Sequence, residues 1–249
     1  MMQAPAANAP LTSADMGRSL LFQLCFWLYT IPMNIAWLPS LLLPRIVIRK
    51  GLEYWCLATL WALRTCAGIT FEVRGRERLP GGPYLLASKH QSMWETIAIN
   101  VILKDPAVIV KKELSYVPFW GWFAHRMGSI WVDRDAGASA LKSMVTEAKD
   151  RLAHGRAVVI FPEGTRKVPG AEPDYKPGIA ALYSQLGVPC VPAALNSGLF
   201  WPRSGPWRKP GHIVFEFLEP IPPGLKRQAF MAELQSRIET RTAELLAAS

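Results

Sequence analysis

LLASKHQSMWETIAI, residues 85–99, passes from a short apolar run through a polar loop into a second apolar run. The first run is typical of a buried β-strand, and the second has the length of a helix. Ser92, followed three residues later by Glu95, matches a capping box, so a helix is predicted to begin at Met93. His90 then lies between the carboxyl end of a strand and the amino end of a helix. In open α/β sheets, ligands bind at this edge.

The sequence around this stretch predicts an α/β domain. From residue 69 onward, short β-rich runs alternate with helical ones, and no internal repeat or linker divides residues 69–249. This alternation favours a mixed, largely parallel sheet flanked by helices. We expect strands at residues 69–73, 84–87, 107–110, 129–132, 157–161, 190–194 and 212–218. We expect helices at residues 93–103, 117–126, 138–153, 178–186 and 227–247.

The chain as a whole is apolar and basic. Half of its 249 residues are hydrophobic, 19% are charged, and ten are Trp, which is favoured at membrane interfaces. The formal net charge of +9 favours an anionic partner, meaning anionic lipid, a phosphorylated substrate or nucleic acid. Nucleic acid is disfavoured because the sequence contains no zinc-finger spacing, RRM-type motif or long Lys/Arg tract. The four cysteines (25, 56, 66 and 190) form no C-x-x-C pair and are predicted to be buried thiols rather than a zinc site or disulfides.

The first 68 residues predict a tail followed by a membrane anchor. Residues 1–16, rich in Ala and Pro, are expected to be disordered, and residues 17–68 to form apolar helices. No charged residue occurs from 19 to 44. As a helix this stretch would measure about 39 Å, longer than a bilayer core of roughly 30 Å.

The geometry of this anchor is left open by the sequence. Pro32 and Pro39 allow either one kinked span or two short helices that enter one leaflet. A second apolar segment, residues 54–69, carries only Arg64, and cations lie between the segments at 45, 49 and 50. Both segments could instead be core helices of a soluble domain, but four tryptophans favour a membrane. The loop at residues 199–211 mixes Trp with Arg and Lys and is predicted to be exposed and to touch the membrane.

His90 and Glu95 form a candidate acid–base pair. A neutral imidazole can accept the proton of a hydroxyl near neutral pH. A carboxylate on its other ring nitrogen fixes the tautomer and stabilises the imidazolium that forms. The alternative is that Glu95 only closes the capping box, although one carboxylate can do both. The sequence has no Gly-x-Ser-x-Gly elbow, so a substrate hydroxyl would supply the nucleophile.

Cations follow two other predicted strands. VVIFPEGTR, residues 158–166, ends a strand with Gly164, which lets backbone approach a ligand, and Arg166, which can hold a phosphate by two hydrogen bonds. VIVKKEL, residues 108–114, ends another strand with two lysines. Each stretch also has an ordinary interpretation, as a turn with a surface arginine or as a solvated charge pair.

The three strand ends together indicate one site. If the strands are parallel neighbours, His90, Lys111 and Arg166 face a single crevice. A base beside two phosphate-binding cations suits the activation of a hydroxyl on a phosphorylated molecule.

These residues resemble a known family. KHQSMWE, VKKELSYVPFWGW, GSIWVDRD, FPEGTR and VPCVPAAL occur in the order expected of the glycerolipid acyltransferases. The closest likeness is to bacterial 1-acyl-sn-glycerol-3-phosphate acyltransferases, and it runs from about residue 69 to 222. The spacing of His-x4-acid ahead of Phe-Pro-Glu-Gly-Thr-Arg is highly specific.

The resemblance implies acyl transfer from a thioester to the 2-hydroxyl of lysophosphatidic acid. His90 would be the general base, oriented by Glu95, which stands where the family usually has aspartate. Backbone N–H groups at the start of the following helix would stabilise the oxyanion. Lys111 and Arg166 would bind the substrate phosphate, and the pocket would be shaped by Glu163, Gly164 and Thr165. Lys176, in YKPG, is expected near the site.

The resemblance also implies partners and a location. The donor would be acyl-acyl carrier protein or acyl-coenzyme A, with no other cofactor and no metal. The enzyme would lie on membrane lipids at the cytoplasmic face of the inner membrane. Asp133 and Arg134 are expected to form a structural ion pair, and His125, His154 and His212 to be non-catalytic. Two alternatives stay open: O-acylation of another lyso-lipid such as lyso-ornithine lipid, and a catalytically silent membrane-binding protein.

Overall fold

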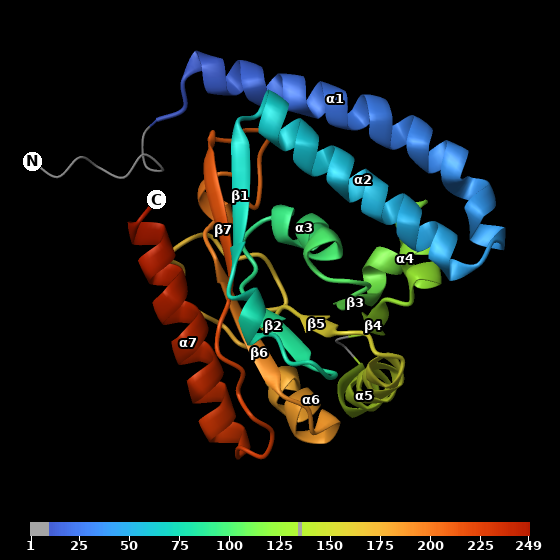
Figure 1. Cartoon of the computed structure of the whole chain (residues 1–249), viewed down its shortest axis with the longest axis vertical. Coiled ribbons are helices and arrows are strands. Elements are labelled where there is room, and N and C mark those ends of the chain that lie inside the picture. Colours follow the sequence, from blue (N-terminus) through green and yellow to red (C-terminus); the bar gives the residue numbers. More distant parts are fainter. Residues whose placement is uncertain (1–9, 134–135) are drawn as a thin grey trace, which may run out of the picture.

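The computed structural model, which describes residues 10–133 and 136–249, places one seven-stranded sheet between two layers of helices (Figure 1). The strand order is β1-β7-β6-β2-β5-β3-β4. The strands are β1 (Ile69–Arg74), β2 (Leu85–Ser88), β3 (Ala107–Lys111), β4 (Ile130–Val132), β5 (Val158–Ile160), β6 (Cys190–Leu195) and β7 (Gly211–Phe217). All seven expected strands are therefore confirmed, and each observed end lies within one residue of the expected one.

The central strands run parallel. β2 pairs in parallel with both β5 and β6, and β3 pairs in parallel with β5 and β4. β7 is antiparallel to β6, and β1 is parallel to β7, so the sheet is mixed but largely parallel, as predicted. Every residue of β2, β5 and β6 is buried, which explains why these strands are apolar throughout rather than alternating.

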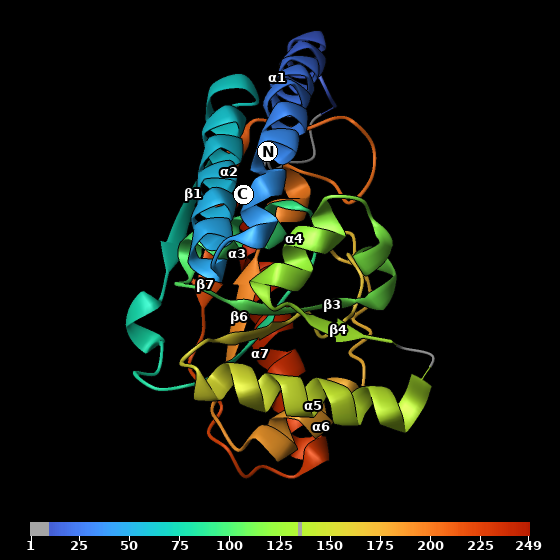
Figure 2. The same ribbon diagram turned by 90° about the vertical axis from the view of Figure 1, so that its right-hand side faces the viewer.

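Helices cover both faces of the sheet. One face is packed by α3 (Trp94–Ile102) together with the N-terminal helices. The other is packed by α5 (Gly137–Ala153), α6 (Gly178–Leu186) and α7 (Arg227–Ala247). Figure 2 shows α4 (Trp120–Met127) beside β3 and β4, at the side of the N-terminal helices.

The starts of three helices differ from the prediction, that of α5 by one residue. α3 begins at Trp94 rather than Met93, a difference of one residue, and the hydroxyl of Ser92 accepts the Trp94 N–H at 2.8 Å as an N-terminal cap does. The helix expected at residues 117–126 begins at Trp120, after a 3₁₀ turn, η4 (Lys112–Tyr116). Phe119 has φ of 63° and ψ of −61°, and the Trp120 N–H bonds to the Pro118 carbonyl at 2.7 Å. This tight turn explains why the helix cannot start earlier.

The N-terminal segment forms a helical hairpin along the top of the view in Figure 1. α1 (Ser13–Trp37) runs through Pro32 without ending, and η2 (Leu38–Leu42) turns the chain into α2 (Arg45–Cys66). Thr12 and Asp15 form a capping box at the start of α1. The predicted tail at residues 1–16 is therefore too long, since Ser13 to Met16 are helical. Residues 1–9 lie outside the described part of the chain.

The hairpin shows one buried and one exposed face. The stretch Ser13–Leu42 is long and apolar enough to cross a membrane by length and composition. α2 packs on the sheet and on α3, whereas α1 leaves much of its apolar surface bare. The large exposed apolar side chains of the hairpin are Leu20, Leu21, Leu24, Trp27, Leu28, Ile31, Ile35, Leu42, Leu43, Ile46, Tyr54, Leu57 and Trp61.

The loop at residues 199–211 is exposed only in part: residues 202–206 are exposed, as its composition predicted, whereas the residues on either side pack on the domain. Trp201 and Arg208 are buried, and the Arg208 guanidinium lies between the rings of Trp201 and Phe22 of α1, at 4.5 and 4.4 Å. Burial lowers the pKa of Arg208 to about 10. The loop is also tied to α1 by Ser19, whose hydroxyl accepts the Arg208 N–H at 2.9 Å. Arg208 and Trp201 therefore hold the hairpin on the domain, because the Arg208 cation stacks on aromatic faces rather than facing solvent.

Other expectations about the hairpin are partly corrected. Arg45 is not a free cation, because it pairs with Asp105 at the start of β3. Cys56 and Cys190 are buried as predicted, whereas Cys25 and Cys66 are only partly buried, and all four thiols are free.

Candidate active site

His90 lies in the loop after β2, within hydrogen-bond distance of Glu95 on the first turn of α3. His90 Nδ1 and Glu95 Oε1 are 2.8 Å apart, so the extra methylene of glutamate does not separate the pair. The Glu95 side chain is fully buried, and the His90 side chain is 14% exposed. The bond occupies Nδ1, so Nε2 is the ring nitrogen left to face a substrate.

Glu95 is surrounded by hydrogen-bond donors. Its Oε1 also accepts the N–H groups of Gln91 and Ser92, at 2.6 and 2.7 Å. Its Oε2 accepts the hydroxyl of Ser197 at 2.8 Å. The carboxylate therefore bonds the backbone before the helix and the histidine at the same time, and both sequence interpretations of Glu95 hold. Several donors on a buried carboxylate stabilise its charge and fix its position.

The turn after β5 supports the other side of His90. The ring of Phe161 stacks on the imidazole, with ring centroids 4.1 Å apart and planes inclined by 21°. The Lys167 N–H donates to the His90 carbonyl at 2.8 Å. FPEGTR is thus in direct contact with the histidine, as expected if β2 and β5 are parallel neighbours.

Glu163 points into the protein rather than toward a ligand. Its carboxylate is 1% exposed and bonds to Lys89 Nζ at 2.9 Å. Lys89 also bonds Glu239 of α7 at 2.8 Å, and Glu239 accepts the hydroxyl of Tyr175 at 2.8 Å. Burial raises the pKa of Glu163, and the nearby Lys89 acts in the opposite direction. This network joins the two motif loops to the C-terminal helix, so Glu163 can shape the pocket only through the backbone of its turn.

The remaining residues of the turn are accessible from solvent. Gly164 has φ of 64°, a conformation that favours glycine. Thr165 is exposed, and Arg166 is partly exposed. Among the described residues, the Arg166 guanidinium makes no ion pair, which leaves its hydrogen-bonding edge available for an anion.

Lys111 is the last residue of β3 and Lys112 the first of η4, on the far side of β5 from β2. Two inter-strand spacings separate β3 from β2, roughly 10 Å. Lys111 is half-exposed and lies 3.8 Å from Glu113, a distance at which an exposed pair is weak. Lys112 Nζ lies 2.9 Å from the Asp133 carboxylate, so Asp133 pairs with Lys112. The predicted pair of Asp133 with Arg134 stays a prediction, because Arg134 lies outside the described residues.

Other candidate residues lie around or away from this edge. The Lys176 N–H donates to the Pro162 carbonyl at 2.9 Å, which places YKPG against the FPEGTR turn. The Lys176 side chain itself is exposed and bonds Asp174 at 2.6 Å. His125, His154 and His212 are exposed on other elements.

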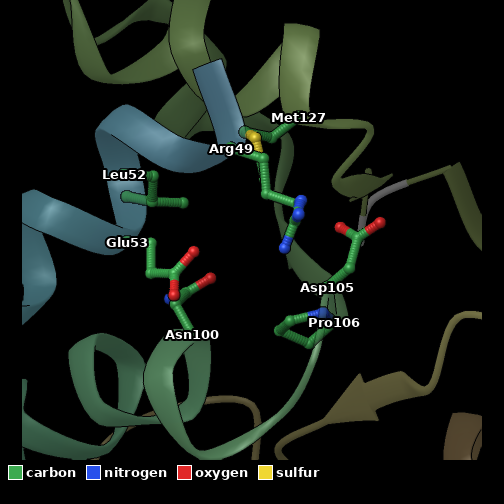
Figure 3. Close-up of a pocket in the computed structure, with 7 residues that line it drawn as sticks. All are labelled: Arg49, Leu52, Glu53, Asn100, Asp105, Pro106 and Met127. Atoms are coloured by element: carbon green, nitrogen blue, oxygen red, sulfur yellow. The ribbon is translucent and has the colours of Figure 1, made fainter. Parts of the chain in front are cut away.

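A second cluster, with Arg49, Glu53, Asn100 and Asp105 among its side chains, lies near the amino end of β3 (Figure 3). It lines a pocket of about 10 Å³ between α2, α3 and the residues that precede β3, and Arg49 points into it. A volume of that size holds at most one water. Next to the pocket, Arg156 donates to the carbonyls of Pro106 and Met127 at 2.9 and 3.1 Å, which ties the residues before β3 to the end of α4.

Two residues that hold the surroundings of the His90–Glu95 pair, referred to below as the dyad, were not predicted from the sequence. Ser197 follows β6, a parallel neighbour of β2, and Lys89 directly precedes His90. The rule that polar residues after parallel strands converge identifies Ser197 once it is applied to β6. Glu239 lies 150 residues from Lys89, and no local pattern indicates the contact.

Comparisons with known proteins agree with this geometry. The family model described as Acyltransferase matches residues 70–196. The chain is 36% identical over 199 residues to the 1-acyl-sn-glycerol-3-phosphate acyltransferase of Pseudomonas aeruginosa, covering 80% of this chain and 77% of that protein. It is 28% identical over 183 residues to the protein of the same name from Saccharomyces cerevisiae, covering 71% of this chain and 60% of that one.

The fold has a counterpart of known structure. The crystal structure of the 1-acyl-sn-glycerophosphate acyltransferase PlsC from Thermotoga maritima matches with a TM-score of 0.76 at 20% identity, covering 93% of this chain and 95% of that one. The family model and the relatives together identify an acyltransferase. The chain belongs to the acyltransferase family, and its relatives above carry names of enzymes of phospholipid biosynthesis.

Proposed function

We propose that this enzyme transfers a fatty acyl group from an acyl thioester to the sn-2 hydroxyl of lysophosphatidic acid, giving phosphatidic acid. The observation that carries the proposal is the contact of the His90–Glu95 pair with the turn that presents Arg166. A base and a phosphate-binding cation are thereby held on neighbouring strands. The names of the relatives support the same acceptor.

The chemistry follows from the two nitrogens of His90. Nδ1–H donates to Glu95, and Nε2 removes the proton of the acceptor hydroxyl as its oxygen attacks the thioester carbonyl. The tetrahedral intermediate collapses, the C–S bond breaks, and the imidazolium returns its proton to the leaving thiolate. Glu95 stabilises the imidazolium between these steps.

The oxyanion is not stabilised by all of the N–H groups expected at the start of α3. The amides of Gln91 and Ser92 donate to Glu95, and that of Trp94 donates to Ser92. These three groups orient the dyad, so another donor must contact the oxyanion.

Arg166 and Lys111 bind the acceptor phosphate in this proposal. Arg166 supplies parallel N–H donors, and Lys111 supplies a point charge at the end of β3. The backbone of Glu163, Gly164 and Thr165 shapes the turn between them. The donor is acyl-acyl carrier protein or acyl-coenzyme A, and the residues named require neither a metal nor a further cofactor.

The hairpin brings this site to the lipid. Besides the bare apolar face of α1, the segment from η4 to α4, which contacts η2 through α4, exposes Leu114, Tyr116, Val117, Trp120 and Trp122. These residues follow Lys111 directly, so a bilayer that covers them brings its headgroups to the end of β3. We infer that the enzyme sits on the cytoplasmic face of the inner membrane and draws lipid from that leaflet.

Thiol release by the full-length enzyme in lipid micelles tests the proposal. Lysophosphatidic acid and lyso-ornithine lipid serve as acceptors, each with wild type and His90→Ala. We expect release with lysophosphatidic acid and a loss of about 10²–10⁴-fold in the variant, because a positioned base contributes that much. Circular dichroism verifies that the variant is folded.

The other outcomes are informative. Release only with lyso-ornithine lipid would retain the mechanism and replace the acceptor. A wild-type rate in His90→Ala would refute the general base. Absence of release with either acceptor would favour a catalytically silent membrane-binding protein.

A further inference from the structure

We infer that Ser197 is a positioning residue of the dyad, a third member that holds Glu95 from the side opposite His90. The inference rests on the proposed function, because it assumes that His90 is the base. It assigns a catalytic support to the turn after β6, a segment far in the sequence from His90 and from FPEGTR.

The contact is short and shielded from water. Ser197 Oγ donates to Glu95 Oε2 at 2.8 Å, and both residues are 0% exposed. Oε1 carries the bonds to His90, Gln91 and Ser92, whereas Ser197 is the side chain that bonds Oε2 among the described residues. Without the hydroxyl, Oε2 would be a buried charged oxygen without a donor, which is costly in a dry site.

The turn that carries Ser197 is fixed on both sides. The side chain of Asn196 accepts the Val214 N–H of β7 at 2.8 Å. The side-chain oxygen of Gln91 accepts the Gly198 N–H at 3.0 Å. A Cβ at Gly198 would lie 2.9 Å from Pro169 and 3.0 Å from Gln91, so the turn fits closely against the His90 loop. Ser197 therefore cannot drift away from Glu95 without moving β7 or Gln91.

This placement has a chemical consequence beyond rigidity. A carboxylate shares its negative charge among its donors, and removal of one donor leaves more charge facing the others. Without Ser197, the imidazolium of His90 would be favoured, so a larger fraction of the base would already be protonated at a given pH. The acidic limb of the pH–rate profile would then move to higher pH.

The charged groups around the pair do not obscure this effect. His90 is the titratable side chain that contacts Glu95. On the neighbouring turn, Glu163 bonds to Lys89, which also bonds Glu239 of α7. Lys167 contacts His90 only through its backbone N–H, and Arg166 makes no ion pair among the described residues.

The test compares Ser197→Ala and Ser197→Cys with Ser143→Ala. Ser143 also donates to a glutamate, Glu147, at 3.2 Å, but this pair is exposed on α5. For each enzyme, kcat/KM for thiol release with lysophosphatidic acid and an acyl-coenzyme A is measured from acid to neutral pH. Cysteine keeps the shape of serine with a weaker donor, so it remains useful if alanine impairs folding.

We expect the acidic limb of Ser197→Ala to move upward by on the order of one pH unit, with about tenfold lower kcat/KM below the limb. Ser197→Cys should give a smaller shift in the same direction, and Ser143→Ala none. A uniform loss of rate with an unmoved limb would overturn the inference, since packing alone explains it. Failure of the proposed function is separate: it appears as wild-type activity in His90→Ala, whatever Ser197 does.

Discussion

The carboxyl edge of the sheet around His90 and the α1–α2 hairpin differ in what they expose to water. At the edge, Glu95, Lys89 and Ser197 are polar groups taken out of water, and each is bonded to another part of the protein. On the hairpin, apolar side chains such as Leu24 and Leu28 are left in water, 58% and 65% exposed. The polar groups of the first region are satisfied by the protein itself, whereas the second is the surface that we propose to lie in lipid.

The two regions are expected to have different roles: the buried polar network determines the geometry around His90, and the exposed apolar face determines where the protein binds. Burial raises the energetic cost of an unpaired charge, so the network at the edge adopts one arrangement. Exposed apolar surface carries no such geometric demand, since the hydrophobic effect scales with area and not direction. Changes at the edge should therefore alter catalysis, whereas changes on the hairpin should alter binding to lipid with little effect on the folded domain.

The largest effect is expected from Glu95→Gln. The amide keeps the shape of the carboxylate but carries no charge for the imidazolium and no longer selects the tautomer of His90. We expect kcat/KM to fall by about 10³–10⁴-fold in the thiol-release assay. The measurement is paired with thermal unfolding, to show that the variant is still folded.

Glu95→Asp is the matched control, because it restores the charge on a side chain one methylene shorter. It should recover most of the activity, with a remaining loss of about tenfold if one hydrogen bond lengthens. Comparable activity of the Gln variant and the wild type would show that Glu95 is only a helix cap.

An intermediate effect is expected from Leu28→Glu on the bare face of α1. Burial of a leucine in lipid stabilises by about 1.5–3 kcal/mol, so its replacement by a charge should weaken binding to anionic vesicles by tenfold or more. Co-sedimentation with vesicles measures the binding. The unfolding midpoint without lipid should not change, because Leu28 is 65% exposed.

Leu225→Glu provides the control for this comparison. Leu225 is 39% exposed and lies just before α7, away from the hairpin. If both leucine variants bind vesicles as wild type does, the face of α1 is not the surface that contacts lipid.

The sequence predicted the sheet more fully than the site. Apolar runs such as residues 158–160 and 190–195 identify buried strands because their neighbours on both faces are apolar. The contact of His90 with Glu95 was likewise predictable, since both lie within one strand–helix connection.

Longer-range contacts could not be predicted in the same way. The bond of Lys89 to Glu239 depends on how α7 crosses the sheet, which no local pattern encodes. The middle of the loop at residues 199–211 is exposed as its composition predicted, but composition did not indicate that Trp201 and Arg208 are buried. Arg208 is buried between the rings of Phe22 and Trp201. Phe22 belongs to α1, so this contact depends on how α1 packs on the loop.

The smallest effect concerns the pH dependence of folding at Glu163. Burial raises its pKa above the ordinary value of 4.5, so the folded state keeps this proton after the unfolded state has lost it. Stability from this group is therefore present below pH 4.5 and is lost as the pH rises through the higher pKa of the folded state. Glu163→Gln cannot ionise, so its free energy of unfolding in urea should depend less on pH across this window.

Glu172→Gln, an exposed carboxylate on the following loop, is the control and should follow the wild type. Lys89 acts against burial at Glu163, which is why the effect is small. If the wild type instead gains stability across the window relative to Glu163→Gln, the ion pair with Lys89 outweighs burial. The network of Lys89, Glu163 and Glu239 would then be stabilised mainly by the attraction of opposite charges, whereas the hairpin surface is apolar.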